Sequence, residues 1–215
     1  MIEFLAELAD GGPALELGIG TGRVAVPLAQ TGVSVDGIEL SEAMAERLEA
    51  KPCAIDIGVT IGDFATATVD REFSLAFVVF NTIKNLTTQE AQVACFQNVA
   101  DHLSPGGYFV IEVLVPMLRS LHPGQNLLAH HMSENKWDVD EYRFATQTST
   151  SHHYSVRDGE LIRNSVPFRY VWPEELDLMA KLAGMERCQR WGGWNREPFT
   201  DDSTFHVSVW QKPRV

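Results

Sequence analysis

Short apolar runs alternate with segments of helical period through the first two-thirds of the chain. The apolar runs are rich in Val, Ile and Phe, and predict strands at Ala14–Leu17, Val33–Glu39, Gly58–Ile61, Ser74–Phe80 and Tyr108–Val115. Helical periodicity predicts helices at Arg23–Gln30, Glu42–Glu49 and Thr88–His102. We expect Ser41 to cap the second helix and Leu103–Gly107 to end the third as a turn. This alternation is typical of βαβ units and predicts a doubly wound, mainly parallel α/β sheet.

The pattern changes between about Pro116 and Val171. Charged residues, Thr, Ser and His alternate with apolar residues there, which predicts antiparallel strands with a hairpin turn at Arg157–Glu160. The chain then returns to a helix with Pro at its start and two strands, at Pro173–Leu182, Met185–Trp191 and Thr204–Gln211. We therefore expect a single domain over residues 1–215, with residues 116–171 as an inserted antiparallel β unit.

Composition and charge narrow the classes of partner. The 215 residues are 45% apolar and 21% charged, as in a globular protein with a real core. A net charge of −12 repels polyphosphate and anionic lipid, so we expect no nucleic-acid and no membrane partner. The first ten residues lack the basic segment of a signal peptide, and the longest apolar run, near Leu75–Phe80, is too short to cross a bilayer. Three cysteines without paired spacing indicate neither a disulfide framework nor a thiolate zinc site, so we expect a cytoplasmic protein.

The most informative segment is Ala14–Arg23, an apolar strand that runs into a turn with three glycines and opens a helix. A dinucleotide-binding turn needs a glycine where Arg23 stands. Glu16, two residues before the first glycine, would repel a pyrophosphate and attract a cation. The segment therefore predicts a site for a nucleoside that carries an amino acid with its ammonium group.

Two acidic positions extend this site. Glu39, at the end of the second strand, can accept hydrogen bonds from both hydroxyls of a ribose. Asp63 follows the third strand and can accept from an adenine amine, with Phe64 along the ring. Asp63 as the cap of a local turn is the alternative.

Together, these residues and the Leu103–Gly107 turn resemble the class I S-adenosylmethionine-dependent methyltransferases over about residues 12–115. The resemblance implies a Rossmann-like seven-stranded sheet with an antiparallel final strand, S-adenosyl-L-methionine as cofactor and S-adenosyl-L-homocysteine as product. It implies a cofactor site formed by Glu16, Gly18, Gly20, Gly22, Glu39, Leu40, Met44, Asp63, Phe64 and Phe80. Within this set, Leu40 and Met44 have an alternative interpretation as core residues that border the pocket.

The methyl acceptor is expected at the end of the fourth strand, where ligands of such sheets gather. Phe80–Leu86 lacks the Asn/Asp-Pro-Pro-aromatic sequence of methyltransferases that act on DNA bases or protein amides. It resembles small-molecule methyltransferases, including those that methylate the nitrogen of amino sugars. Asn81 would line the methyl site, with the alternative that it satisfies nearby backbone groups.

The inserted unit is expected to cover the acceptor. Its His152, His153, Tyr154, Arg169 and Tyr170 offer proton acceptors, donors and an aromatic wall. Adjacent strand residues point to opposite faces, so only one of His152 and His153 can face the pocket, and the two cannot chelate one metal ion. If a general base is needed, His152 or His153 is the candidate, with Tyr154 and Asn81 orienting the acceptor.

No metal site is expected, because no ligand spacing of the H-x-x-x-H kind occurs; His130 and His131 are adjacent in the same way. The Trp191–Thr200 loop is a second candidate wall for a cationic or aromatic acceptor, or else a packed connection between strands.

The predicted function is methyl transfer to N or O of a small molecule. The alternatives are an NAD-dependent oxidoreductase, disfavoured by Arg23 and Glu16, and a non-catalytic domain that binds S-adenosylmethionine. Only residues 1–13 precede the first predicted strand, where relatives carry a helix that closes over the cofactor. Incomplete cover, or cover from a second copy in a homodimer, is therefore expected.

Overall fold

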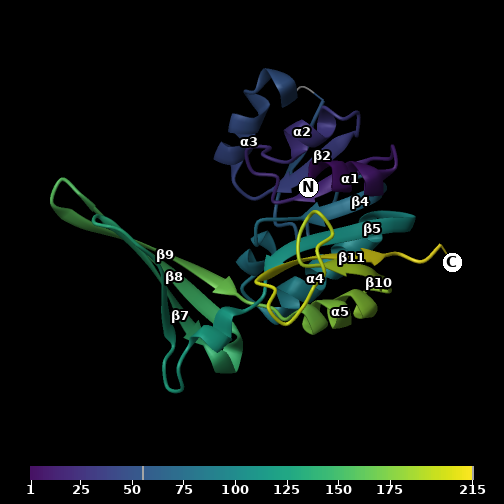
Figure 1. Ribbon diagram of the computed structural model, residues 1–215. Helices are drawn as coiled ribbons and strands as arrows, with labels where there is room; N and C mark the ends of the chain where they lie inside the picture. Colours follow the sequence, from purple (N-terminus) through teal and green to yellow (C-terminus); the bar gives the residue numbers. More distant parts are fainter. Residues whose placement is uncertain (55, 215) are drawn as a thin grey trace.

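A seven-stranded sheet forms the centre of the computed structural model, which describes residues 1–54 and 56–214 (Figure 1). Its order is β10-β11-β5-β4-β1-β2-β3. The bounds are β1 (Ala14–Leu17), β2 (Val35–Glu39), β3 (Gly58–Ile61), β4 (Phe73–Val78), β5 (Leu103–Leu114), β10 (Glu186–Trp191) and β11 (Phe205–Gln211). Among the described strands of this sheet, β11 is the one that runs opposite to the rest, and it pairs antiparallel with β5 and β10. The predicted doubly wound sheet with an antiparallel final strand is confirmed.

Helices cover both faces of the sheet. One face packs against α1 (Ile2–Ala9), α2 (Ala25–Ala29) and α3 (Glu42–Glu49), which bury Leu5, Leu28 and Leu48. The other packs against α4 (Gln89–His102) and α5 (Pro173–Leu182), which bury Phe96 and Leu176. Since successive strand residues point to opposite faces, β1, β2, β4, β5 and β11 supply apolar side chains to both layers.

Some element boundaries differ from those predicted. The helix expected from Arg23 begins at Ala25, because the glycine turn extends further than its last glycine. The Leu103–Gly107 turn is part of β5, where the pairing with β4 shifts register between Phe73 and Leu75. The first helix, α1, was not predicted; it lies beside α2 and β4.

The residues that precede α3 and α4 cap these helices differently, and only Ser41 was predicted as a cap. Thr88 caps α4, and its hydroxyl accepts a hydrogen bond from the backbone N–H of Ala91 at 3.1 Å. Ser41 occupies the N-cap of α3, but its side chain makes no capping hydrogen bond. Its backbone N–H instead donates to the Glu39 carboxylate at 2.9 Å. The start of α3 is therefore tied to the end of β2.

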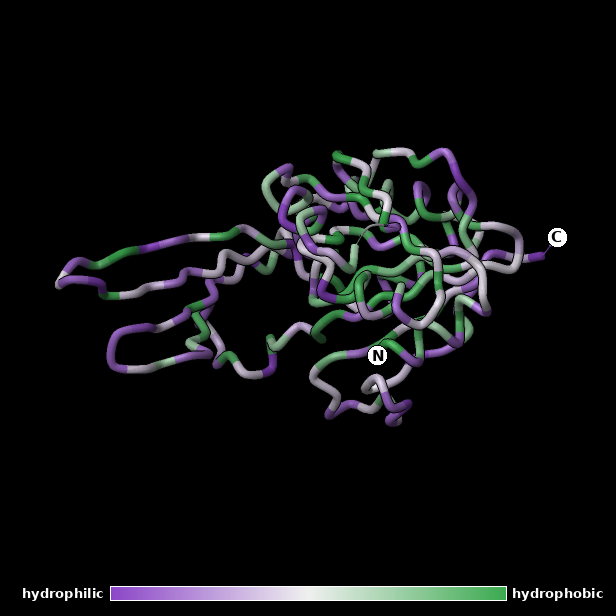
Figure 2. Tube along the Cα trace, turned by 90° about the horizontal axis from the view of Figure 1, so that it is seen from above, coloured by the Kyte–Doolittle hydropathy of each residue, from purple (hydrophilic) through white to green (hydrophobic). Residues whose placement is uncertain are grey.

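A second, antiparallel sheet projects from the main body as a single layer (Figure 1). This arm, residues 127–169, has the order β6 (Leu127–Met132), β7 (Lys136–Arg143), β8 (Thr148–Arg157) and β9 (Glu160–Arg169). Figure 2 shows that hydrophobic residues are concentrated in the main body, whereas hydrophobic and hydrophilic residues alternate along the projecting strands. Among the described residues, neither cluster of buried apolar side chains includes a residue of the arm.

The arm is anchored by Arg169 at the end of β9. Its guanidinium is buried and donates to Glu175 of α5 at 2.6 Å and to the side-chain oxygen of Gln92 on α4. One guanidinium thus bonds to two helices, and this pair of contacts fixes the direction in which β9 leaves the main body.

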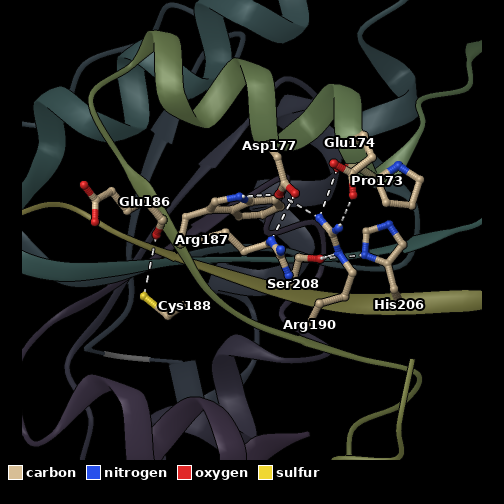
Figure 3. A network of polar contacts seen from close by, with 10 residues as sticks. Pro173, Glu174, Asp177, Glu186, Arg187, Cys188, Arg190, His206 and Ser208 are labelled. Carbon is tan, nitrogen blue, oxygen red and sulfur yellow. Dashed lines mark hydrogen bonds and ion pairs between the residues drawn. The ribbon is translucent and has the colours of Figure 1, made fainter. Parts of the chain in front are cut away.

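A buried polar network fixes α5 to the sheet (Figure 3). Arg190 of β10 donates to Asp177 of α5 at 2.7 Å and to the hydroxyl of Ser208 on β11 at 2.8 Å. Beside it, the buried His206 contacts the Ser208 hydroxyl through Nδ1, while its Nε2 has no partner among the described residues. Burial lowers the pKa of His206 to about 3, with the Arg190 charge as a smaller cause.

Within residues 1–54 and 56–214, the structure contains no helix long and apolar enough to cross a membrane.

Candidate functional site

The glycine loop lies where β1 ends, packed between α3 and the end of β4. Gly18, Gly20 and Gly22 all adopt positive φ, at 72°, 57° and 76°. A Cβ at Gly18 would lie 2.7 Å from Cγ2 of Thr82, and one at Gly22 would lie 2.4 Å from Cδ1 of Leu48. The glycines therefore present bare backbone at the carboxyl end of the sheet.

Glu39 holds this loop from the neighbouring strand. The buried carboxylate accepts hydrogen bonds from the backbone N–H groups of Gly20 at 2.8 Å and Ser41 at 2.9 Å. A carboxylate has about four lone-pair sites. Lone pairs therefore remain on Glu39 for ligand hydroxyls, while its two backbone contacts set the shape of the loop.

Glu16 lies beneath the loop on β1 and is 4% exposed. One of its carboxylate oxygens has no hydrogen-bond partner among the described residues. Burial raises its pKa to about 8; the Ala25 backbone N–H opposes this shift, and the negative charge of Glu39 adds to it. A desolvated carboxyl with a free oxygen favours a positively charged ligand at the loop.

The chain is strained where β4 ends. Phe80 and Asn81 have φ of 55° and 64°, in the left-handed region that non-glycine residues rarely adopt. The Phe80 N–H donates to the carboxylate of Glu112 at 2.7 Å, and the Asn81 side-chain oxygen accepts from the Leu114 N–H at 2.8 Å. Asn81 thus satisfies local backbone, as its alternative interpretation predicted, and holds the ends of β4 and β5 together.

The other predicted cofactor residues lie around the loop in different environments. Asp63 is exposed and its carboxylate accepts from the Ala65 N–H at 2.9 Å, so it caps a turn as its alternative predicted. Phe64 is buried in the core with its ring edge toward Gly18. Leu40 and Met44 are 71% and 39% exposed, so the interpretation of them as core residues is wrong.

Phe80 is also exposed at this edge of the sheet. The ring is 46% exposed, and the guanidinium of Arg23 lies 5.0 Å from its centroid. With Leu40 and Met44, Phe80 leaves apolar surface open at the carboxyl ends of β2 and β4, where a flat ring can pack.

A cavity of about 250 Å³ lies between the end of β5, the arm and η2 (Thr82–Asn85), the short helix that follows Asn81. Most of its wall is apolar or aromatic. The lining residues are Lys84, Leu114, Val115, Pro116, Met117, Leu128, His130, Asp140, Tyr142 and Tyr170. η2 begins directly after Asn81, and its first residue, Thr82, contacts Gly18, so this short helix connects the cavity wall at Lys84 with the glycine loop.

The arm turns only one of its faces to this cavity. Asp140 and Tyr142 line the cavity, and strand alternation puts Asp138 on the same face of β7. On β8, His153 is opposite Asp138 and bonded to it at 2.7 Å. His153 therefore shares the cavity face and His152 does not, in line with the expectation that only one of the two can face the pocket.

His152 and Tyr154, which were expected at the methyl site, lie on the opposite face of the arm and do not line this cavity. His152 contacts Ser165 at 2.8 Å, and the Tyr154 ring stacks on Trp137 with centroids 5.9 Å apart. His153 is also outside the cavity lining, because its position on β8 lies further along the arm.

Two other expected walls have different roles. Arg169 anchors the arm, whereas Tyr170 does line the cavity. In the Trp191–Thr200 loop, Trp194 packs edge-on against Phe4 of α1 at 5.6 Å, and Arg196 pairs with Glu7 at 2.6 Å. This loop is therefore a packed connection, the second of its two predicted interpretations.

Sequence reasoning missed several residues of the site. Lys84, Asp140 and Tyr142 line the cavity and Glu112 fixes the end of β4, but no motif marks them. The only signal was alternation of polar and apolar residues in β7, which does not say which face meets the main body. In the described part of the chain, no three His, Cys, Asp or Glu side chains gather as a metal site.

Comparisons with known proteins agree with this geometry. A family model described as "Methyltransferase domain" matches residues 14–107. The solved CcbJ methyltransferase of Streptomyces caelestis is 34% identical, with a TM-score of 0.88 over 99% of this chain and 88% of that chain.

Two more distant proteins are similar as well. A cypemycin N-terminal methyltransferase from a Streptomyces species is 27% identical over 89% of this chain and 79% of its own length. An amino pentose methyltransferase of calicheamicin biosynthesis, from Micromonospora echinaspora, has 18% identity and a TM-score of 0.73 over 98% of this chain and 88% of its own. At that identity, the likeness concerns the fold.

Proposed function

This chain belongs to the class I S-adenosylmethionine-dependent methyltransferases, and we propose that it methylates a nitrogen atom of a small-molecule acceptor bound in the cavity beside η2. Methyl transfer from S-adenosylmethionine to a small molecule follows from the family. The choice of nitrogen over oxygen, and the cavity as the acceptor site, are the proposed steps.

The observation that carries the assignment of the cofactor to the glycine loop is the free carboxylate oxygen of Glu16 under that loop. Together with Glu39, it makes the loop a site for a cationic nucleoside and disfavours a pyrophosphate. An NAD-dependent oxidoreductase is therefore not favoured, in agreement with the family.

The residues at the loop fit the cofactor. S-adenosylmethionine supplies an electrophilic methyl group on a sulfonium. Glu16 would face the cationic methionine portion, Glu39 the ribose hydroxyls, and the exposed apolar side chains of Leu40 and Met44 the adenine. Asp63 keeps one carboxylate oxygen beyond its turn contact for the adenine amine. A side chain at Gly18 or Gly22 would collide with Thr82 or Leu48, so glycine at these positions preserves the path of the loop backbone.

Support for a nitrogen acceptor comes from relatives. The cypemycin enzyme acts on an N-terminus by its name, and a neighbour of similar fold acts on an amino pentose. A nitrogen nucleophile requires a lone pair and correct alignment, and the leaving sulfur needs no proton. In this chain, the alignment would come from the rigid joint of Phe80 and Asn81, which Glu112 and Leu114 hold.

The arm has a matching proposed role as cover. Residues 116–171 leave β5 next to the cavity and return to α5, and they supply Met117, Leu128, Asp140, Tyr142 and Tyr170 to its wall. We propose that this inserted unit, within one methyltransferase domain, excludes water from the acceptor.

A second copy of the chain is proposed as a partner of the arm's outer face, the face of Trp137 and Tyr154. Met132 and Leu161 share that face by register and are 82% and 62% exposed. Residues 127–169 carry five Lys or Arg and six Asp or Glu, so repulsion between two copies is weak there despite the −12 of the whole chain. Light scattering of the purified protein at several concentrations tests this homodimer.

Two measurements test the proposed function. S-adenosylhomocysteine should raise the melting temperature, whereas NAD should not. Methyl-labelled S-adenosylmethionine should then label an amine in a panel of matched amines and alcohols. Labelling of alcohols alone would contradict nitrogen specificity, and binding without any labelling would favour the non-catalytic alternative.

A further inference from the structure

The cavity beside η2 contains an unpaired cation. Lys84 lines it three residues after Asn81, and its ammonium lies 5.1 Å from the centroid of the Phe168 ring. Within the described residues, this ammonium makes no hydrogen bond and no ion pair; it lies over the aromatic face of Phe168. A ring face compensates a desolvated cation only partly.

Burial disfavours the charged form of Lys84. The pKa of Lys84 is lowered by desolvation, and the negative charge of Asp140 partly opposes the shift. A half-buried ammonium that has lost water without gaining a direct ion pair would be stabilised by an anionic oxygen that enters the cavity. Lys84 therefore marks an anion subsite.

An acidic group lies on the arm side of the same cavity. Asp140 accepts a hydrogen bond from the Tyr142 hydroxyl at 3.4 Å, and His130 Nδ1 lies 3.8 Å from it. Burial raises the pKa of Tyr142 to about 12, with the charge of Asp140 as the next cause, so its hydroxyl stays a donor at neutral pH. Asp140 keeps lone pairs for an N–H donor from a ligand.

Lys84 and Asp140 share the cavity without an ion pair between them: in the described structure, Asp140 contacts Tyr142 and His130 instead. We propose that the cavity recognises an acceptor that carries both a carboxylate and an amine on an apolar framework, with Lys84 bound to the carboxylate and Asp140 to the amine. This rests on the proposed function and specifies its acceptor class.

Size and charge restrict that class. A cavity of about 250 Å³ is smaller than the ~300–1,000 Å³ of typical ligand pockets, so it holds a small molecule or the charged end of a larger one. Asp140 would repel a dianion such as phosphate, whereas a zwitterion presents one charge to each residue. Before methyl transfer, the ammonium of such an acceptor gives its proton to Asp140 or to water, which leaves the nitrogen lone pair free to attack the methyl group. Leu114, Met117 and Leu128 suit an aliphatic remainder.

Calorimetric titration of the protein saturated with S-adenosylhomocysteine tests the proposal with matched probes. Leucine carries both groups, isoamylamine lacks the carboxylate, and 4-methylpentanoate lacks the amine; proline and pyrrolidine form a second pair. We expect each amino acid to bind at least about tenfold more tightly than its one-charge analogues. In Lys84→Met, the affinity for leucine should fall to that for isoamylamine. In Asp140→Asn, the affinity for leucine should fall to that for 4-methylpentanoate.

Controls separate charge recognition from misfolding. Lys84→Arg should retain the preference for the amino acid, and Lys181→Met, at an exposed position on α5, should behave as wild type. An unchanged melting-temperature increase with S-adenosylhomocysteine shows that each variant is folded.

Equal affinities within each pair, no detectable binding of any amino acid, tighter binding of inorganic phosphate, or an unchanged preference in Lys84→Met would each overturn the proposal. Failure of the wild type to bind S-adenosylhomocysteine would instead overturn the proposed function. The same titrations on the protein alone would then decide the zwitterion site separately.

Discussion

The Glu39 carboxylate and the Gly20 backbone N–H are joined by a 2.8 Å hydrogen bond between the end of β2 and the glycine loop. The bond is buried and connects residues 19 positions apart. It fixes the loop against the neighbouring strand, and the same carboxylate is placed to receive ribose hydroxyls. One side chain therefore supports both the shape of the cofactor site and the binding of its ligand.

Replacing Glu39 with Gln should weaken cofactor binding through both roles. Hydrogen bonds to charged groups contribute about 1.5–3 kcal/mol, so the Kd for S-adenosylhomocysteine should rise by roughly 10- to 100-fold. Titration calorimetry measures this, with Glu42→Gln on the exposed start of α3 as the control. A Kd within twofold of wild type for Glu39→Gln would contradict the assignment.

Glu16 should make stability depend on pH in the unliganded protein. Its folded pKa of about 8 exceeds the ordinary 4.5, so the folded state retains a proton that the unfolded state has lost. The contribution to stability is therefore full below pH 4.5 and is lost as pH rises to about 8, by up to about 1.4 kcal/mol per pH unit. Urea unfolding should show this slope in wild type and a flatter one in Glu16→Gln.

Binding of a cation at the loop should make Glu16 lose its proton. Because the positive ligand favours the carboxylate, cofactor binding at pH 7 should release a proton. Calorimetry in two buffers of different ionisation enthalpy detects such release, and Glu16→Gln should abolish it. Buffer-independent enthalpies in wild type would be inconsistent with this assignment.

The cofactor side of the site could be predicted from the sequence because it is built from local segments. A strand, a glycine turn and an acidic residue at the next strand's end follow each other in the chain, and parallel pairing of β1 with β2 brings Glu16 and Glu39 to one edge. The exposure of some side chains at this site could not be predicted. Leu40 and Met44 are apolar residues of the kind found in protein cores, but both are exposed to solvent at the site.

The acceptor side could not be predicted in the same way. The inserted strands were expected, but the face that meets the main body depends on the register of β7 and on the anchor at Arg169, both set by tertiary contacts. A shift of one residue exchanges the two faces of a strand. Thus the conspicuous His152 and Tyr154 face outward, while the unremarked Asp140 and Tyr142 line the cavity.

His206 should make the protein sensitive to acid. Its pKa of about 3 is below the ordinary 6.5, because the buried imidazole resists protonation. Above pH 6.5 the imidazole is neutral in both states and the free energy of unfolding is unaffected by this group. As the pH falls from 6.5 toward 3, the unfolded state gains a proton that the folded state lacks, so the free energy of unfolding decreases by up to about 1.4 kcal/mol per pH unit. His206→Phe should reduce this loss in urea unfolding, whereas His122→Phe at an exposed position should not. Parallel pH profiles for wild type and His206→Phe would refute this role.

Asn81 combines backbone strain with a hydrogen bond, and two substitutions separate them. Asn81→Ala loses the contact to the Leu114 N–H and keeps the unfavourable φ of 64°, so it should destabilise by about 1–3 kcal/mol. Asn81→Gly loses the contact but tolerates the angle, so its loss should be smaller. Turnover should fall in both, since the joint positions the acceptor. Greater stability of the Ala variant than the Gly variant would show that strain is unimportant here.

The arm histidines should be dispensable for methyl transfer. His152 faces away from the cavity, and His153 is held by Asp138 at 2.7 Å outside the cavity lining. Neither is placed to take a proton from an acceptor there, so His152→Gln and His153→Gln should keep kcat within about twofold of wild type, a change of roughly 0.4 kcal/mol in the barrier. Tyr170→Ala, which removes a wall of the cavity, should lower kcat/KM more strongly. Steady-state assays at saturating cofactor, with light scattering to check assembly, make the comparison. If His153→Gln lost most of its kcat while its oligomeric state stayed that of wild type, His153 would have to contact the acceptor, and this assignment would be wrong.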